Sequence, residues 1–187
     1  MGRKITGLSK SMDLYCSKAE NRVNSPSFAL LFKGEPETKM ENTKVLLVED
    51  DQEDAVLTLR ALKKNNIEDK IYVVRDGVEA LDFLFCTNKY AKRDPHDMPQ
   101  LILLDMELPK MNGLEVLHRV RADDRTHRLP VVILSSSNEE QVIVESYKSG
   151  ANSYVSKPTD YAQFMESVRQ LGSYWLGSNA APPTRGL

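Results

Sequence analysis

Four large aliphatic residues, Leu101-Ile102-Leu103-Leu104, run directly into an acidic residue, Asp105. A short apolar run of this kind is typical of a strand that is covered on both faces, as in a parallel sheet. Pro109 and the pair Asn112-Gly113 follow and force the chain to turn. We therefore expect Asp105 at the carboxyl end of a buried strand, where open α/β sheets bind their ligands. Alone, the pattern is equally compatible with a carboxylate that only caps the loop.

Apolar runs alternate with amphipathic segments from Lys44 to about Leu171. Strands are predicted where the apolar runs are short and continuous, at 45–48, 71–74, 101–104, 131–134 and 153–156. Apolar residues at helical spacing predict helices at 54–65, after Asp76-Gly77, after Gly113, from Ser137 to Ser149-Gly150, and through Phe164, Val168 and Leu171. Ser137-x-x-Glu140 has the form of a capping box, so the fourth helix is expected to begin there. The last strand is more polar, as expected at a sheet edge.

Five strands that alternate with five helices predict an α/β fold. With right-handed crossovers, this order makes a three-layer, doubly wound parallel sheet. We assign residues 43–172 to this single domain, and we find no internal repeat or second domain in the sequence.

The composition excludes several classes of protein. With a net charge of −2 and no run of Lys or Arg, the chain of 187 residues is not expected to bind DNA directly. No apolar stretch approaches the ~20 residues that span a bilayer, so no membrane association is expected. The two cysteines, Cys16 and Cys86, are too few for a disulfide framework or a metal site, which favours a reducing, cytoplasmic location.

The two ends of the chain differ from the domain. We expect residues 1–42 to be a disordered N-terminal extension, because polar residues there follow no sustained period. Two interpretations remain open: Met40 is the true start and the preceding stretch is a gene-model artefact, or residues 28–32 form a docking segment. In the tail, 173–187, the cluster Tyr174-Trp175-Leu176 suggests packing onto the domain or at a dimer interface.

Polar residues follow the predicted strands where each strand ends. Glu49, Asp50 and Asp51 follow the first strand, Asp105 the third, Ser135 the fourth and Lys157 the fifth. Because the carboxyl ends of parallel strands meet at one edge, these groups should converge on one crevice. Clustered carboxylates repel one another unless a cation is present, and a small set of oxygen ligands suits Mg²⁺. Lys157 and the Ser135 hydroxyl would contact phosphoryl oxygens. The set therefore predicts phosphoryl transfer onto Asp105.

These motifs, in this order, resemble the receiver domain of two-component response regulators. The resemblance covers Lys44 to about Leu171 and rests on Glu49-Asp50, on Asp105 within Leu-Leu-Asp-Met-Glu-Leu-Pro-Lys-Met-Asn-Gly, on Ser135, on Tyr154 and on Lys157-Pro158. It implies a flavodoxin-like sheet with the strand order 2-1-3-4-5.

The resemblance also implies a role for each residue. A histidine kinase or phosphotransfer protein would donate a phosphoryl group to Asp105, and Lys157 would pair with it. Mg²⁺ would be held by Asp50, Asp105 and the backbone carbonyl of Glu107, with Glu49 acting through water. Ser135 and Tyr154 would be the switch residues, which reshape the face of the fourth helix, fifth strand and fifth helix for a partner. The side chain of Glu107 flanks Asp105, so we expect it to influence the phosphoryl lifetime.

The long loop 88–99, the segment Gly150-Ala151-Asn152-Ser153-Tyr154 and Tyr174-Trp175-Leu176 resemble the small regulators that are paired with bacterial phytochromes. Members of that group have no output domain and commonly dimerise through the switch face. The chain is thus expected to be a phosphoacceptor and not an enzyme.

The sequence disfavours two other functions. A phosphatase of the haloacid-dehalogenase type needs Asp-x-Asp-x-Thr on its first strand, whereas here the acid lies on the third strand in Asp105-Met-Glu-Leu-Pro, without Thr. A receiver fold that acts only as an unphosphorylated adaptor is disfavoured by the intact set of Asp50, Asp105, Ser135 and Lys157.

Overall fold

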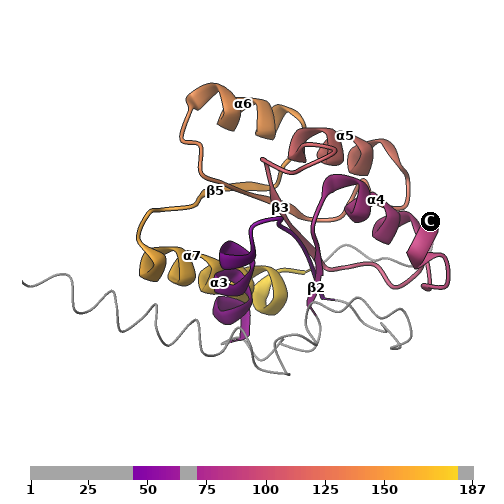
Figure 1. The fold of residues 1–187 in the computed structure, drawn as a ribbon, viewed down its shortest axis with the longest axis horizontal. Helices are drawn as coiled ribbons and strands as arrows, with labels where there is room; N and C mark the ends of the chain where they lie inside the picture. Colours follow the sequence, from indigo (N-terminus) through magenta and orange to yellow (C-terminus); the bar gives the residue numbers. More distant parts are fainter. Residues whose placement is uncertain (1–43, 64–70, 181–187) are drawn as a thin grey trace, which may run out of the picture. The chain divides into compact units, whose positions relative to one another are not determined.

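The computed structural model describes residues 44–63 and 71–180. The expected N-terminal extension, the alternative start at Met40 and the expected helix end near Asn65 lie outside these ranges. The described part of the chain forms an α/β domain (Figure 1).

The sheet has five parallel strands in the order β2-β1-β3-β4-β5. The strands are β1 (Val45–Val48), β2 (Ile71–Val74), β3 (Leu101–Asp105), β4 (Val131–Ser135) and β5 (Ser153–Ser156). The predicted fold class and strand order are therefore confirmed, and the polar strand β5 does form an edge of the sheet.

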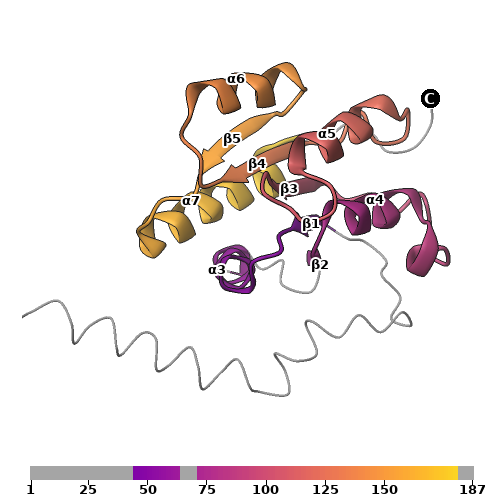
Figure 2. The same cartoon turned by 45° about the horizontal axis from the view of Figure 1, so that its top comes forward.

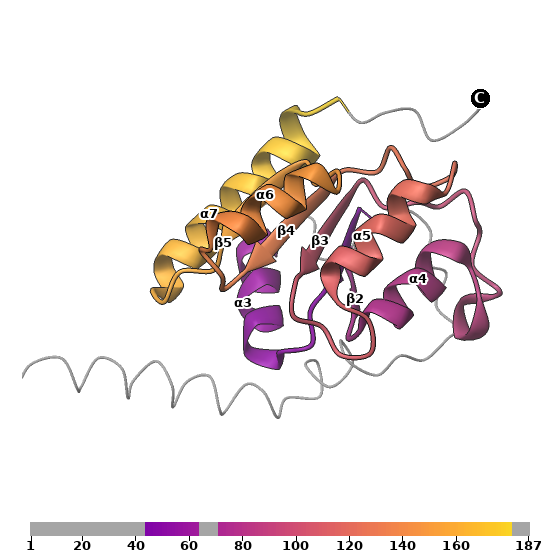
Figure 3. The same ribbon diagram turned by 90° about the horizontal axis from the view of Figure 1, so that it is seen from above.

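Helices cover both faces of the sheet (Figures 1 and 3). On one face lie α3 (Gln52–Lys63) and α7 (Tyr161–Ser173), which contact each other. On the other lie α4 (Gly77–Phe85), α5 (Gly113–Ala122) and α6 (Glu140–Lys148). Within the described ranges, no helix is both long enough and apolar enough to cross a membrane.

The three central strands are buried on both faces, and their side chains alternate between two cores. Leu46, Ile102 and Ile133 belong to a core that includes residues of α4 and α5, such as Phe83 and Leu117. Since successive side chains in a strand point to opposite faces, the neighbouring residues in each strand point toward α3 and α7. This alternation explains the unbroken apolar runs in the sequence.

Two predicted helix starts need correction. Helix α3 begins at Gln52, two residues before the predicted start, with Asp51 as its cap: the Asp51 carboxylate accepts the N–H groups of Glu53 and Asp54 at 2.8 and 2.9 Å. The predicted capping box at Ser137 is wrong, because α6 begins only at Glu140 and has no side-chain cap. The Ser137 carbonyl instead accepts the Tyr154 hydroxyl at 2.8 Å, which holds this segment outside the helix.

Other segments are more ordered than their composition suggests. The polar loop after α4 contains a 3-10 turn, Asn88–Tyr90, and buries Tyr90 and Arg93. The Arg93 guanidinium stacks over the ring of Phe83 at 4.0 Å. After α7 the chain continues as a π-helical turn, Tyr174–Ser178, so part of the expected tail is helical.

Two contacts fix the position of the loop that follows Asp105. Gly113, at the start of α5, packs against Asp105: a Cβ atom there would lie 2.3 Å from the Asp105 carbonyl oxygen. Lys110 in the same loop donates to the carboxylate of Asp76 at 2.5 Å, and Asp76 also caps α4 by accepting the Glu79 N–H at 2.7 Å. The loop is thus tied to two helix starts.

Replacing Gly113 with alanine should lower the free energy of unfolding by about 2 kcal/mol, because backbone atoms cannot yield to a Cβ as a flexible side chain can. Gly177→Ala is the matched control, since a Cβ at Gly177 meets nothing within 4 Å. Urea unfolding of both variants measures their free energies of unfolding and so tests the close contact between Gly113 and the Asp105 backbone. Equal stabilities of the two variants would contradict it.

The pKa of Asp76 lies below its ordinary value of 3.8: burial would raise it, but the hydrogen bonds from Lys110 and the Glu79 N–H outweigh burial. A lowered folded-state pKa stabilises the protein above the unfolded value, and this stabilisation is lost as the pH falls through the folded value. Asp76→Asn should therefore cost about 1 kcal/mol at neutral pH and progressively less below pH 3.8. Urea unfolding across this range measures the difference, which should shrink in a Lys110→Met background. A pH-independent difference would argue against the contact.

Candidate functional site

The polar residues predicted to converge do lie at one edge of the sheet. Glu49 and Asp105 continue the side of β1 and β3 that faces α3 and α7, because Val45 pairs with Leu101 and Val48 with Leu104. Ser135 ends β4, and Lys157 follows β5. The Lys157 N–H donates to the Ser135 carbonyl at 2.7 Å, which carries the strand pairing up to the site.

The Lys157 ammonium is the centre of this site. Its Nζ lies 2.7 Å from Glu49 Oε2, 2.9 Å from Asp105 Oδ2 and 2.9 Å from Asp54 Oδ2. The three ammonium hydrogens therefore have three carboxylate partners. Burial disfavours the charged ammonium, but Glu49 and Asp105 outweigh burial and raise the pKa of Lys157. Lys157 is thus a fixed positive charge.

Glu49 is completely buried, and one ammonium does not neutralise the carboxylates around it. Burial, followed by repulsion from Asp105, raises the pKa of Glu49 to about 8, although Lys157 acts in the opposite direction. Its Oε1 atom has no hydrogen-bond partner among the described residues. A buried carboxylate oxygen without a partner is costly, and a cation would remove that cost.

Carboxylate oxygens of Glu49, Asp50 and Asp105 all lie within 4.8 Å of one another. Asp50 is exposed, whereas Glu49 and Asp105 are buried, so the cluster opens to solvent on one side. Hard oxygen donors with an open side fit a divalent cation that keeps part of its water shell. The residues present therefore form an acidic metal site.

Backbone groups hold the Asp105 carboxylate in place. Its Oδ1 atom accepts the N–H of Met106 at 2.6 Å and the N–H of Glu107 at 3.3 Å, while Oδ2 faces Lys157. The side chain of Glu107, two residues after Asp105, is exposed. Asp105 is therefore oriented from both sides before any ligand arrives.

The two predicted switch residues are connected through the loop between β4 and α6. The buried Ser135 hydroxyl accepts the N–H of Ser137 at 3.1 Å, and the Ser137 carbonyl accepts the Tyr154 hydroxyl. Tyr154 is half-buried, and its N–H donates to the hydroxyl of Tyr147 on α6 at 3.3 Å. Hydrogen bonds thus lead from Ser135 to α6.

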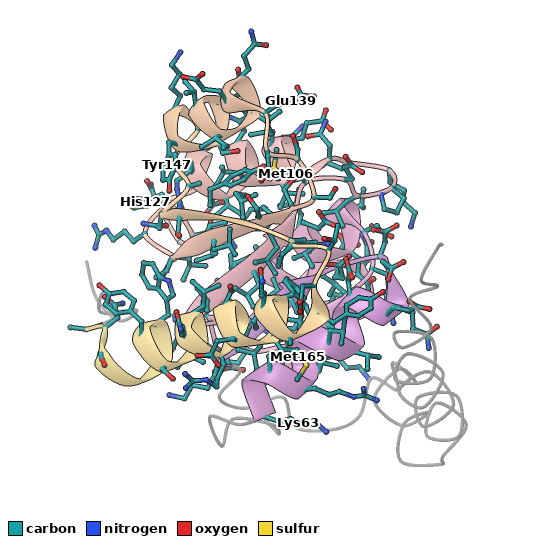
Figure 4. The ribbon with its side chains drawn as sticks, turned by 90° about the vertical axis from the view of Figure 1, so that its left-hand side faces the viewer. Lys63, Met106, His127, Glu139, Tyr147 and Met165 are labelled. Carbon is teal, nitrogen blue, oxygen red and sulfur yellow. The ribbon has the colours of Figure 1, made fainter. Side chains whose placement is uncertain are left out.

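Helix α6 lies beside β5 (Figure 2), and only Ser146 of its residues is buried. The exposed fractions of Val144 and Tyr147 are 42% and 50%, which is high for apolar and aromatic side chains. In Figure 4, Tyr147 marks α6 above the edge of the sheet and Met165 marks α7 below it. The edge with α6 and β5 is the least buried part of the sheet and its helices.

Asp54 is the one contact of Lys157 that the sequence did not suggest. Asp54 lies on the first turn of α3, and its carboxylate reaches Lys157 from there. Once Asp51 is recognised as the cap, an acid three residues later at the site edge is the signal that was available. The predicted site residues Glu49, Asp50, Asp105, Ser135 and Lys157 lie together, and Tyr154 reaches them through Ser137.

Comparisons with known proteins agree with this geometry. A profile of the response regulator receiver domain matches residues 45–169. The response regulator Rcp1 of Synechocystis sp. is 35% identical over 138 residues, which cover 74% of this chain and 92% of Rcp1. A solved Mn²⁺-bound form of Rcp1 is 33% identical over 75% of this chain and 99% of that chain, with a TM-score of 0.70.

Two further solved structures are similar. The phosphorylated cyanobacterial phytochrome response regulator RcpA is 36% identical over 76% of this chain and 99% of that chain, with a TM-score of 0.71. The bacteriophytochrome response regulator AtBRR is 46% identical over 72% of this chain and 96% of that chain, with a TM-score of 0.59. The chain therefore belongs to the response regulator receiver domain family, whose members are phosphoacceptor signalling proteins.

Proposed function

We propose that this protein accepts a phosphoryl group on Asp105 from a histidine kinase or a phosphotransfer protein. The observation that carries this proposal is the contact between Lys157 and Asp105, 2.9 Å apart, next to the buried carboxylate of Glu49. A lysine held beside an oriented carboxylate can neutralise the charge that a phosphoryl group brings.

The transfer needs few protein groups. An oxygen of Asp105 attacks the phosphorus atom, the P–N bond to the donor histidine breaks, and the imidazole nitrogen takes the electron pair and a proton. Lys157 and the Ser135 hydroxyl contact the phosphoryl oxygens, and Met106 and Glu107 hold the attacking carboxylate. Positioning and electrostatic stabilisation therefore account for most of the chemistry.

The proposal includes Mg²⁺ at the acidic metal site. Asp50, Asp105 and the backbone carbonyl of Glu107 would hold the ion, with Glu49 acting through water. The ion would supply positive charge to the oxygens of the transferred group. Support comes from the unpartnered Oε1 of Glu49 and from the Mn²⁺ in the related Rcp1.

The proposed readout is the surface of α6, β5 and α7. When Ser135 moves toward the phosphoryl group, the Ser137 loop moves with it, and Tyr154 loses or changes its hydrogen bond. The exposed Val144 and Tyr147 would then form part of a changed interface for a partner or for a second copy of the chain. A homodimer through this face is part of the proposal.

The names of the related proteins support a finer assignment. RcpA and AtBRR are phytochrome response regulators, and we propose that a phytochrome kinase is the donor here. A cytoplasmic location, expected from the cysteine content, belongs to the same proposal. The alternative, a receiver fold that binds partners without phosphorylation, shares the interface but needs no reaction at Asp105.

Incubation with Mg²⁺ and a small phosphodonor should add one phosphoryl group, seen by intact-mass spectrometry as an acid-stable, base-labile adduct. Asp105→Asn should abolish the adduct, because the nucleophilic carboxylate is lost. Asp124→Asn is the matched control, since Asp124 is exposed after the far end of α5. An adduct that survives Asp105→Asn would refute the assignment, and no adduct on the unaltered chain would favour the adaptor.

Asp50→Asn should stabilise the metal-free protein, because it removes one of the mutually repelling carboxylates. At about 2–4 °C for each kcal/mol in a domain of this size, the melting temperature should rise by a few degrees. The same substitution should reduce the further rise that Mg²⁺ causes in the unaltered protein, because a ligand has been removed. Thermal denaturation with and without Mg²⁺ measures both effects. A larger response to Mg²⁺ in the variant would exclude Asp50 as a ligand.

A further inference from the structure

The third carboxylate on Lys157 is not among the residues that the proposed transfer uses. Asp54 comes from the first turn of α3, whereas Glu49 and Asp105 follow or end strands. The exposed fraction of the side chain is 31% for Asp54, but 0% for Glu49 and 9% for Asp105. Asp54 therefore holds the ammonium from the rim of the site, and the other two hold it from within.

An ammonium group has three hydrogens, and all three are directed to carboxylates here. A phosphoryl oxygen that pairs with Lys157 must therefore replace one acceptor or share a hydrogen with it. Glu49 is enclosed, and Asp105 carries the phosphoryl group itself. Asp54 lies at the rim, so losing its hydrogen bond from Lys157 costs less free energy than losing either of the other two.

We propose that Asp54 is a positioning residue that competes with the phosphoryl group for Lys157 and so limits how strongly the phosphorylated state is held. This inference rests on the proposed function, since it needs a phosphoryl group at Asp105. Asp54 also adds a negative charge near the phosphoryl oxygens, which acts in the same direction.

Asp54 is not one of the residues of the acidic metal site. Its carboxylate is not part of the group formed by Glu49, Asp50 and Asp105 within 4.8 Å. Neutralising Asp54 should therefore change the affinity for a phosphoryl analogue much more than the affinity for Mg²⁺. A residue with only a structural role would not separate these two affinities.

The test measures binding of beryllium fluoride, a phosphoryl analogue, to the full chain by calorimetry at saturating Mg²⁺. Asp54→Asn keeps an oxygen that can accept from Lys157 but removes its charge. The dissociation constant of the analogue should fall about threefold to fivefold, the upper part of the range expected for an exposed ion pair. The Mg²⁺ dissociation constant, measured without fluoride, should stay within about twofold of the unaltered protein.

Asp51→Asn is the matched control. It removes the same charge one turn away, and asparagine still caps α3. Asp54→Glu should restore the affinity of the unaltered chain, because it returns the charge. If Asp54→Asn does not fold, Asp54→Ser removes the same charge at this rim position and serves in its place.

The outcomes are distinguishable. If the unaltered chain binds no analogue and accepts no phosphoryl group, the proposed function fails and this inference fails with it. If the unaltered chain binds the analogue but Asp54→Asn binds it no more tightly than Asp51→Asn does, only the role of Asp54 is refuted. Tighter binding in Asp54→Asn alone, reversed in Asp54→Glu, supports it.

Discussion

The Lys157 ammonium is the interaction on which the functional edge of this protein depends. Three carboxylates, from the residue after β1, the end of β3 and the start of α3, meet it at 2.7–2.9 Å. Without the ammonium their charges would repel one another in a partly buried crevice. Burial, followed by repulsion from Asp105, raises the pKa of Glu49, although Lys157 acts in the opposite direction. Glu49 Oε1 also has no hydrogen-bond partner among the described residues, and it lies in the cluster formed with Asp50 and Asp105. This group of oxygen atoms has the composition of a site for a divalent cation.

The buried centre of the fold could be predicted from the sequence, because its cause is local. Strands covered on both faces must be apolar at every position, and the runs in β1, β3 and β4 have no other simple explanation. The acids and the lysine at the strand ends follow from the same topology. These residues lie at the same edge of the sheet because the strands are parallel. Their position can therefore be predicted without knowledge of side-chain contacts.

Features that depend on contacts between distant residues could not be predicted. The capping box at Ser137 is a sound local signal, but a hydrogen bond from Tyr154, seventeen residues away, takes the carbonyl that would have begun the helix. Asp54 was missed for a related reason: its relevance depends on its contact with Lys157, 103 residues away. In both cases the deciding contact joins residues that are far apart in the sequence.

Lys157 and its carboxylate partners are far apart in the sequence, and this separation affects how the domain folds. The lysine is separated by 108 residues from Glu49, 103 from Asp54 and 52 from Asp105. Contacts so distant in sequence form only after the intervening chain has been ordered, because the entropy of closing each loop must first be overcome. A partly synthesised or partly unfolded chain that lacks β5 thus has its acids but not their lysine. Only the fully folded domain therefore has the lysine and the acids together, as holding a phosphoryl group requires.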